Sequence, residues 1–166
     1  MVKKQVSLVV SITVDRQNII KIARVVPLSS QQLDCVVGEL KLHRNRYFWF
    51  VVSQKQQLEE WFIEKYADNL HWLYMCEFQK LSEQFIEKYA DKVNWATISQ
   101  CQKLSEQFIE KYKDKLEWVY ICAYQKLSPE FIMKHIDRIQ RSVFDNPCFD
   151  EYPDPVRLLL KQKFNK

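Results

Sequence analysis

Glycine is almost absent from this sequence, since Gly38 is the only one among 166 residues. Phosphate-binding loops of the Walker and dinucleotide types, and the nucleophile elbow of α/β-hydrolases, each need several closely spaced glycines. The composition therefore excludes most nucleotide-binding and hydrolase classes. Because 47% of the residues are hydrophobic and 14% aromatic, it also excludes a disordered chain.

Patterns for metal binding and disulfide bonding are missing as well. The five cysteines are odd in number and form no CxxC pair, and the three histidines stand in neither HExxH nor ligand spacing with a cysteine. His71 fits best as a helix cap or a surface residue. We therefore expect no metal, no cofactor, no small-molecule substrate and no catalytic centre, and a reducing, cytoplasmic environment.

The sequence contains no long hydrophobic run. The first residues, MVKKQVSLVVSITV, are interrupted by Ser and Thr, lack a cleavage site of small residues and are too short to span a bilayer, so no membrane association is expected. The net charge is +4. Residues 1–57 hold nine Lys or Arg against three acidic residues, so the basic excess lies in the first third of the chain.

A repeat of 23 residues dominates what is present. Two residue types recur at this spacing, namely Trp49, Trp72, Trp95 and Trp118, and Leu58, Leu81, Leu104 and Leu127. The two most similar copies read LSEQFIEKYADKVNWATISQCQK and LSEQFIEKYKDKLEWVYICAYQK. A fixed period of this length is typical of a stack of structural repeats.

Each copy predicts two amphipathic helices. In one copy, hydrophobic residues recur at helical spacing from Leu81 to Val93, and again from Trp95 to Gln102. Ser82, Ser105, Ser128 and Asn94 are expected to cap these helices at their N-termini. Since a hairpin of two short helices cannot bury its hydrophobic stripe alone, neighbouring copies must stack into a short α-solenoid.

The string KLSEQFIEKYADKVNW resembles short helical repeats, roughly LSExFIEKYxDKVxWxxIxxxQ, that recur in proteins of large DNA viruses, phages and some bacteria. The resemblance covers residues 49–139, and it implies a viral, phage or other mobile-element origin. The family has no settled biochemical activity. Two departures, Glu59 in place of the capping Ser and Arg141 in place of a fifth Trp, indicate that the array ends near these residues.

The two ends of the chain follow other patterns. Residues 5–14 and 19–26 are rich in β-branched residues and predict an N-terminal β-hairpin over 1–28, which would cover the first repeat. The helical array would then occupy 29–140, starting near Ser29 or Ser30. Residues 141–166 would form an extended segment and a short capping helix that begins near Asp154 and Pro155. The fold class is thus mainly α.

Some polar positions recur in every copy and are better explained by structure than by chemistry. Cys76 and Cys122 stand where other copies have Ser53 and Ser99, which indicates a position that needs a small side chain and not a catalytic thiol. Carboxylate pairs such as Glu83 with Glu87 recur on the polar side of the first helix, and a solvated face explains them better than acid–base catalysis.

One face of the second helix changes from copy to copy and carries aromatic residues. Such a face is expected to bind a host or self protein, with inhibition of a host factor as an elaboration. The competing explanation is that its aromatic residues pack against neighbouring helices. The expected partner-binding residues are Tyr74, Glu77, Phe78, Thr97, Gln100, Cys101, Tyr120, Ala123 and Tyr124.

The alternative function is nucleic-acid binding through the basic first third of the chain. It would use Lys21, Arg24, Lys41, Arg44 and Arg46 against phosphates, with Tyr47 or Trp49 available for base stacking. An enzyme is the least favoured class, because no convergent set of polar residues is found in the sequence.

Overall fold

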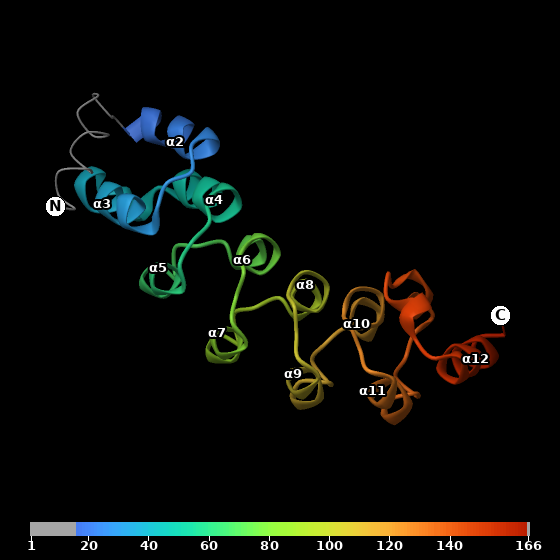
Figure 1. Cartoon of the computed structure of the whole chain (residues 1–166). Helices are drawn as coiled ribbons and strands as arrows, with labels where there is room; N and C mark the ends of the chain where they lie inside the picture. The colour runs from blue at the N-terminus through green and yellow to red at the C-terminus, as the bar shows by residue number, and fades with distance from the viewer. Residues whose placement is uncertain (1–15, 166) are drawn as a thin grey trace. The chain divides into compact units, whose positions relative to one another are not determined.

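A computed structural model describes residues 16–165 of the chain, and it is mainly helical (Figure 1). The described chain forms two compact units, the first ending at Leu81 and the second beginning at Ser82. The elements of the first unit are α2 (Arg16–Val25), α3 (Ser30–Leu40), η1 (Leu42–Arg44), α4 (Arg46–Lys55), α5 (Glu60–Lys65) and α6 (Trp72–Phe78). Those of the second unit are α7 (Glu83–Lys88), α8 (Trp95–Cys101), α9 (Glu106–Lys111), α10 (Trp118–Tyr124), α11 (Pro129–Lys134), η2 (Arg141–Asp145), η3 (Phe149–Glu151) and α12 (Asp154–Lys163).

Within each unit the helices alternate between two layers. In the first unit α4 packs between α2 and α6, and in the second unit α10 packs between α8 and the 3-10 helix η2. The shorter first helices, α5 in one unit and α7, α9 and α11 in the other, form the second layer (Figure 1). Each repeat in the described chain therefore supplies one helix to each layer, as the two helical periods predict.

The helix boundaries confirm most of the predicted caps. The hydroxyls of Ser82, Ser105 and Ser128 accept hydrogen bonds from the backbone N–H three residues later, and the Asn94 carbonyl oxygen accepts one from Thr97. Such bonds satisfy N–H groups that have no partner inside a helix. His71 lies at the N-terminus of α6, but its side chain makes no capping hydrogen bond and is exposed. Of the two interpretations of His71, a helix cap or a surface residue, the second is therefore correct.

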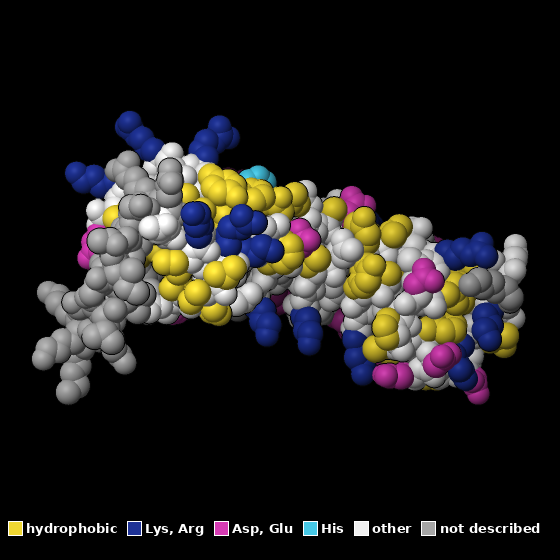
Figure 2. Space-filling model, turned by 90° about the horizontal axis from the view of Figure 1, so that it is seen from above, with side chains coloured by type: hydrophobic (Ala, Val, Ile, Leu, Met, Phe, Trp, Pro, Cys, Tyr) yellow, Lys and Arg dark blue, Asp and Glu magenta, His cyan; other side chains and the backbone are white. Residues whose placement is uncertain are grey.

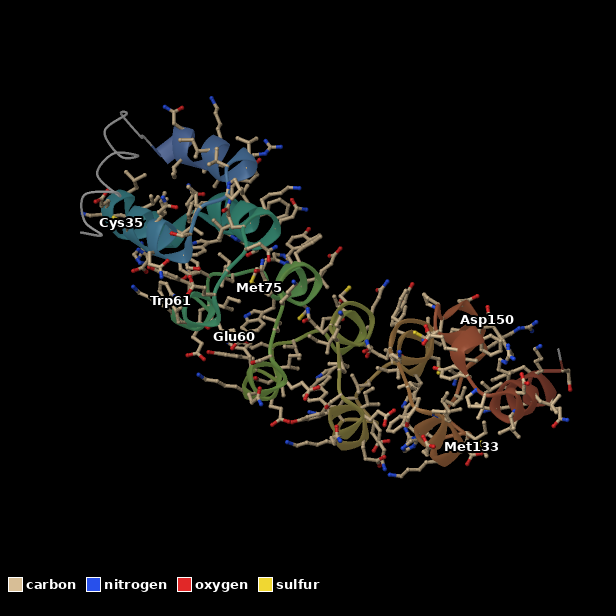
Figure 3. The ribbon with its side chains drawn as sticks, in the orientation of Figure 1. Cys35, Glu60, Trp61, Met75, Met133 and Asp150 are labelled. Atoms are coloured by element: carbon tan, nitrogen blue, oxygen red, sulfur yellow. The ribbon has the colours of Figure 1, made fainter. Side chains whose placement is uncertain are left out.

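The core of each unit repeats the same side chains. Every first helix from α5 to α11 buries a Phe–Ile pair, and the second helices bury Met75, Ile98 and Ile121 at one equivalent position. Met75 is fully buried, whereas Trp61 of α5 and Met133 of α11 are exposed (Figure 3). The burial thus follows the position in the repeat and not the hydrophobicity of the residue alone.

The prediction of a strand over residues 19–26 is wrong, because α2 covers them as far as Val25. Ile19 and Ala23 are buried at helical spacing, while Val25 is 79% exposed. A strand would place all three side chains on one face. The other predicted strand, residues 5–14, lies outside the described residues, and no strand occurs in residues 16–165.

The C-terminal prediction is correct for its helix and wrong for its extended segment. α12 begins at Asp154 with Pro155 in its first turn and buries Val156 and Leu160. Residues 141–151, predicted to be extended, contain η2 and η3. None of the helices in the described part of the chain is long and apolar enough to cross a membrane.

Candidate protein-binding surface

Buried amide side chains fix the register between successive second helices. In the second unit, Nε2 of Gln125 donates to the carbonyls of Ser99 and Gln102 at 3.0 and 2.8 Å, and its Oε1 accepts from the N–H of Leu104 at 3.1 Å. In the first unit, Gln79 contacts the carbonyl of Gln56 and the N–H of Leu58 in the same way. The ends of the helices of one copy are thereby satisfied by an amide of the next.

A second register contact explains the small polar position on the second helix. The hydroxyls of Ser53 and Ser99 and the thiol of Cys122 each accept a hydrogen bond from the backbone N–H 18 residues later, which belongs to His71, Glu117 and Gln140 respectively. Burial raises the pKa of the Cys122 thiol, which disfavours a reactive thiolate. The position therefore combines small size with a hydrogen-bond acceptor.

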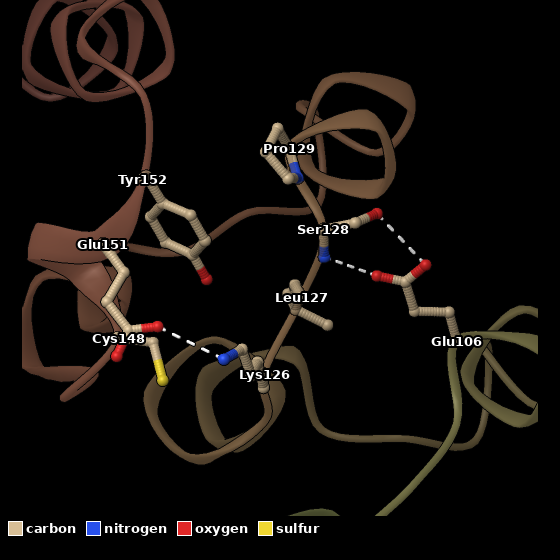
Figure 4. A pocket seen from close by; sticks show the side chains of 8 residues that line it. All are labelled: Glu106, Lys126, Leu127, Ser128, Pro129, Cys148, Glu151 and Tyr152. Atoms are coloured by element: carbon tan, nitrogen blue, oxygen red, sulfur yellow. Dashed lines mark hydrogen bonds and ion pairs between the residues drawn. The ribbon is translucent and has the colours of Figure 1, made fainter.

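The recurrent carboxylates of the first helix bind the next copy, which the sequence interpretation missed. Glu106 accepts hydrogen bonds from the backbone N–H and the hydroxyl of Ser128, as Glu83 does from Ser105 (Figure 4). Glu87 pairs with Lys111 at 2.8 Å. The partners are 22 and 24 residues apart, which is close to the 23-residue period of the repeat. The sequence alone nevertheless favours a solvated face as the simpler interpretation of these carboxylates.

Glu110 is the most connected of these carboxylates. It contacts Nζ of Lys113 and of Lys134 at 2.9 Å and Nε2 of His135 at 2.6 Å. Hydrogen bonds from Lys113 and then Lys134, with that of His135, lower its pKa to about 2. This network joins α9 to α11 in the second unit.

The same contacts extend beyond the predicted array at both ends. Gln56 donates hydrogen bonds to the carbonyls of Ala23 and Val26. In each case the sequence separation is seven residues longer than the separation between Gln125 and its corresponding partner. The sequence separation between Lys65 and its ion-pair partner Asp34 is also seven residues longer than that between Lys111 and Glu87. α2 and α3 therefore take the places of one more repeat, with an insertion of about two helical turns.

At the other end of the second unit, Asn146 takes the place of the glutamine. Its Nδ2 donates to the carbonyls of Cys122 and Gln125 at 2.8 and 2.7 Å, with separations two residues shorter than those of Gln125. The short η2 thus stands in for a second helix. Beside it lies a hollow of about 350 Å³, which an ion pair between Lys126 and Glu151 borders (Figure 4).

The outer face of the second helices in the first unit carries a cluster of aromatic rings. The ring of Phe50 on α4 meets Tyr74 on α6 edge to face at 5.3 Å, and it stacks with Tyr47 at 6.2 Å. Tyr74 also contacts His71 at 4.7 Å and Phe78 at 6.0 Å. Tyr47, Phe50 and Phe78 stay 53%, 36% and 39% exposed, so these rings contact one another without being covered. We call these five side chains the aromatic face.

The second unit has a smaller exposed face at the equivalent helices. Tyr124 of α10 is 57% exposed and lies 6.3 Å from Tyr120, while Val119 is 49% exposed. On α8, Gln100 and Cys101 are exposed and Thr97 is half-buried. Ala123 is buried and Glu77, on α6 of the first unit, is exposed, so eight of the nine predicted partner-binding residues keep accessible surface. Figure 2 looks at the side of the second helices and shows hydrophobic side chains beside Lys and Arg.

The residues of the nucleic-acid alternative are only partly brought together. Lys41, Arg44 and Arg46 line one hollow before α4. Lys21 and Arg24 lie on the exposed side of α2 and do not line it. Trp49 is 2% exposed, which leaves Tyr47 as the aromatic residue accessible for stacking.

Comparisons with models of protein families, with curated proteins and with solved structures found no match to this chain. In the described part of the chain, no group of three or more His, Cys, Asp or Glu residues is placed to hold a metal ion. The exposed surface of the chain is therefore the guide to its function.

Proposed function

We propose that this chain is a short α-solenoid without catalytic activity that binds a protein partner through the outer face of its second helices. Glutamine, serine and carboxylate contacts of the same kind recur in both units, with Asp34 in the first unit in the place of Glu87, and this recurrence supports a repeating stack. It is also in keeping with our proposal that the copies belong to the LSExFIEKYxDKVxW repeats of viral, phage or other mobile-element proteins. A host or self protein is the partner that we propose.

The observation that carries the binding proposal is the aromatic face. Aromatic side chains bury 150–250 Å² each when covered, so leaving Tyr47, Phe50 and Phe78 this exposed forgoes on the order of 5 kcal/mol of gross burial free energy. Tyr and Phe rings held in place by neighbouring rings lose little conformational entropy on binding. Arg46 lies one helical turn before Phe50 on α4, so a partner with an apolar centre and an acidic rim fits this surface.

Site-specific photo-crosslinking tests the proposal with a matched control. Benzoylphenylalanine is placed at Phe78 of α6 or at Trp61 of α5, which are 39% and 38% exposed in the same unit. In extract of the native host, position 78 is expected to yield one defined protein adduct and position 61 none. That adduct is expected to disappear when Phe50→Ser and Tyr74→Ser are added.

The protein so identified is then purified and its binding measured directly. Phe50→Ala and Tyr74→Ala are each expected to raise Kd by about 30-fold, the size typical of a residue at the centre of an interface. An adduct from position 61 that equals the one from position 78, or a Kd unchanged in both variants, would refute the proposal.

A further inference from the structure

The turn between α3 and α4 concentrates positive charge around a hollow. Its sequence, KLHRNR over residues 41–46, contains three cationic side chains and no acidic one. The hollow measures about 440 Å³ and is lined by Lys41, Leu42, Arg44, Asn45 and Arg46. This volume exceeds what a single water or a monatomic ion would fill.

Several contacts hold this turn in its shape. Lys41 has a φ of 50°, in the left-handed region, and ends α3, while the next side chain, Leu42, is 1% exposed and anchors the turn. Asn45 caps α4 by accepting from the N–H of Phe48 at 3.0 Å. The carbonyl of His43 accepts from Nε1 of Trp49 at 3.2 Å and from Nδ2 of Asn69 at 2.7 Å. The backbone that carries the three cations is thus fixed before any ligand arrives.

Within the part of the chain that the structure describes, the three cations have no carboxylate partner of the kind that several lysines have. Lys65, Lys111 and Lys134 each pair with an acidic side chain, whereas Lys41, Arg44 and Arg46 form no ion pair within residues 16–165. Like charges held close to one another repel, and an anion in the hollow would relieve that repulsion. Arginine and lysine together suit the oxygens of a phosphate group.

We propose that this hollow, the basic pocket, binds consecutive backbone phosphates of single-stranded nucleic acid, with one contact from each of its three cations. A strand is favoured over a free phosphorylated ligand because Tyr47 follows Arg46, is 53% exposed and stacks with Phe50, which offers a platform for a base beside the phosphate site. The site goes beyond protein binding, although it shares Arg46 and Tyr47 with the surface proposed for the protein partner.

Fluorescence anisotropy with a labelled single-stranded oligonucleotide of about 15 nucleotides tests the site on the full chain. Three phosphate contacts predict a slope of about −2 for log K against log salt, so affinity should fall about 20-fold between 50 and 200 mM salt. The variant Lys41→Gln/Arg44→Gln/Arg46→Gln is expected to abolish this slope. A control with the same charge change, Lys80→Gln/Lys103→Gln/Lys161→Gln, should keep it.

Two further arms identify the source of the phosphate and the role of the aromatic ring. Tyr47→Ala is expected to weaken oligonucleotide binding about tenfold without changing the salt slope, because it removes stacking and not charge. Circular dichroism of each variant confirms that the fold is kept. No oligonucleotide binding at 50 mM salt, tight binding of pyrophosphate alone, or equal losses in the basic-pocket and control variants would each overturn the proposal.

Discussion

A glutamine amide has two donor hydrogens and an acceptor oxygen, and Gln125 uses all of them on backbone groups of the preceding copy. The same type of contact recurs at Gln56 and Gln79, and it recurs with a shorter side chain at Asn146. Buried polar groups stabilise a fold only when their partners are present. These amides therefore specify the register at which copies pack.

Replacing Gln125 by Leu should lower the free energy of unfolding by about 3 kcal/mol, because it leaves the Leu104 N–H and two carbonyls buried without partners. Gln107→Leu, on the exposed side of α9, serves as the control and should change the stability by less than about 0.5 kcal/mol. Urea denaturation followed by circular dichroism measures both. Equal effects of the two substitutions would show that the amide does not set the register.

The carboxylate of Glu110 predicts a dependence of stability on pH. Its pKa is about 2 in the folded protein and 4.5 in a free chain, so the network stabilises the fold fully above about pH 4.5. This contribution is lost as the pH falls from 4.5 toward 2, since the unfolded chain then binds a proton that the folded chain does not. Urea midpoints between pH 6 and pH 3 should fall more steeply in the natural protein than in Glu110→Gln.

A midpoint that falls with equal slope in both proteins would contradict this role of Glu110. Because Lys113 and Lys134 are partly exposed, the difference should shrink as salt is raised. Glu130→Gln, at an exposed position of α11, provides a control with the same change of charge.

At the scale of elements, α2 shows why the N-terminal prediction failed. The segment IIKIARVV has strong β propensity, but propensity measures how well a side chain fits a half-buried sheet and gives way to packing. Ile19 and Ala23 are buried at helical spacing in α2, which packs against α4, and Gln56 binds carbonyls at the C-terminal end of α2. A seven-residue insertion between Asp34 and Gln56 hid this copy from a search at a period of 23.

Two alanine substitutions distinguish the helix from the predicted strand. Ile19→Ala should cost about 2–4 kcal/mol of stability, because the side chain is 4% exposed in α2. Val25→Ala should change it by less than about 0.5 kcal/mol at 79% exposure. In a strand both side chains would lie on one face, so comparable costs in thermal unfolding would contradict the helix.

The repeated elements themselves were predictable from the sequence. Caps at Ser82, Ser105, Ser128 and Asn94 and the start of α12 near Asp154 all follow from local patterns. Contacts such as Glu106 with Ser128 were not predictable with equal ease, because a carboxylate on a polar helix face has the same pattern whether water or the next copy binds it.

At the scale of the whole molecule, the two sides of each second helix differ in what they contact. The constant side, with Gln79, Ser99 and Gln125, binds neighbouring copies within each unit. The variable side leaves Phe78 and Tyr124 exposed. Comparison of copies predicted this division, but not the contribution of Tyr47 and Phe50, which lie in the first copy, where fewer equivalent residues are available for comparison.

Hydroxyl-radical footprinting of the free protein and of its complex with the crosslinked partner tests the central claim most directly. In the free protein Phe78, Tyr47 and Trp61 should all oxidise readily, since each is exposed. In the complex, oxidation of Phe78 and Tyr47 on the second helices should fall several-fold, as expected for residues buried in an interface, while that of Trp61 on α5 stays the same. Protection of Trp61 with Phe78 and Tyr47 unchanged would place the partner on the first helices and contradict the account.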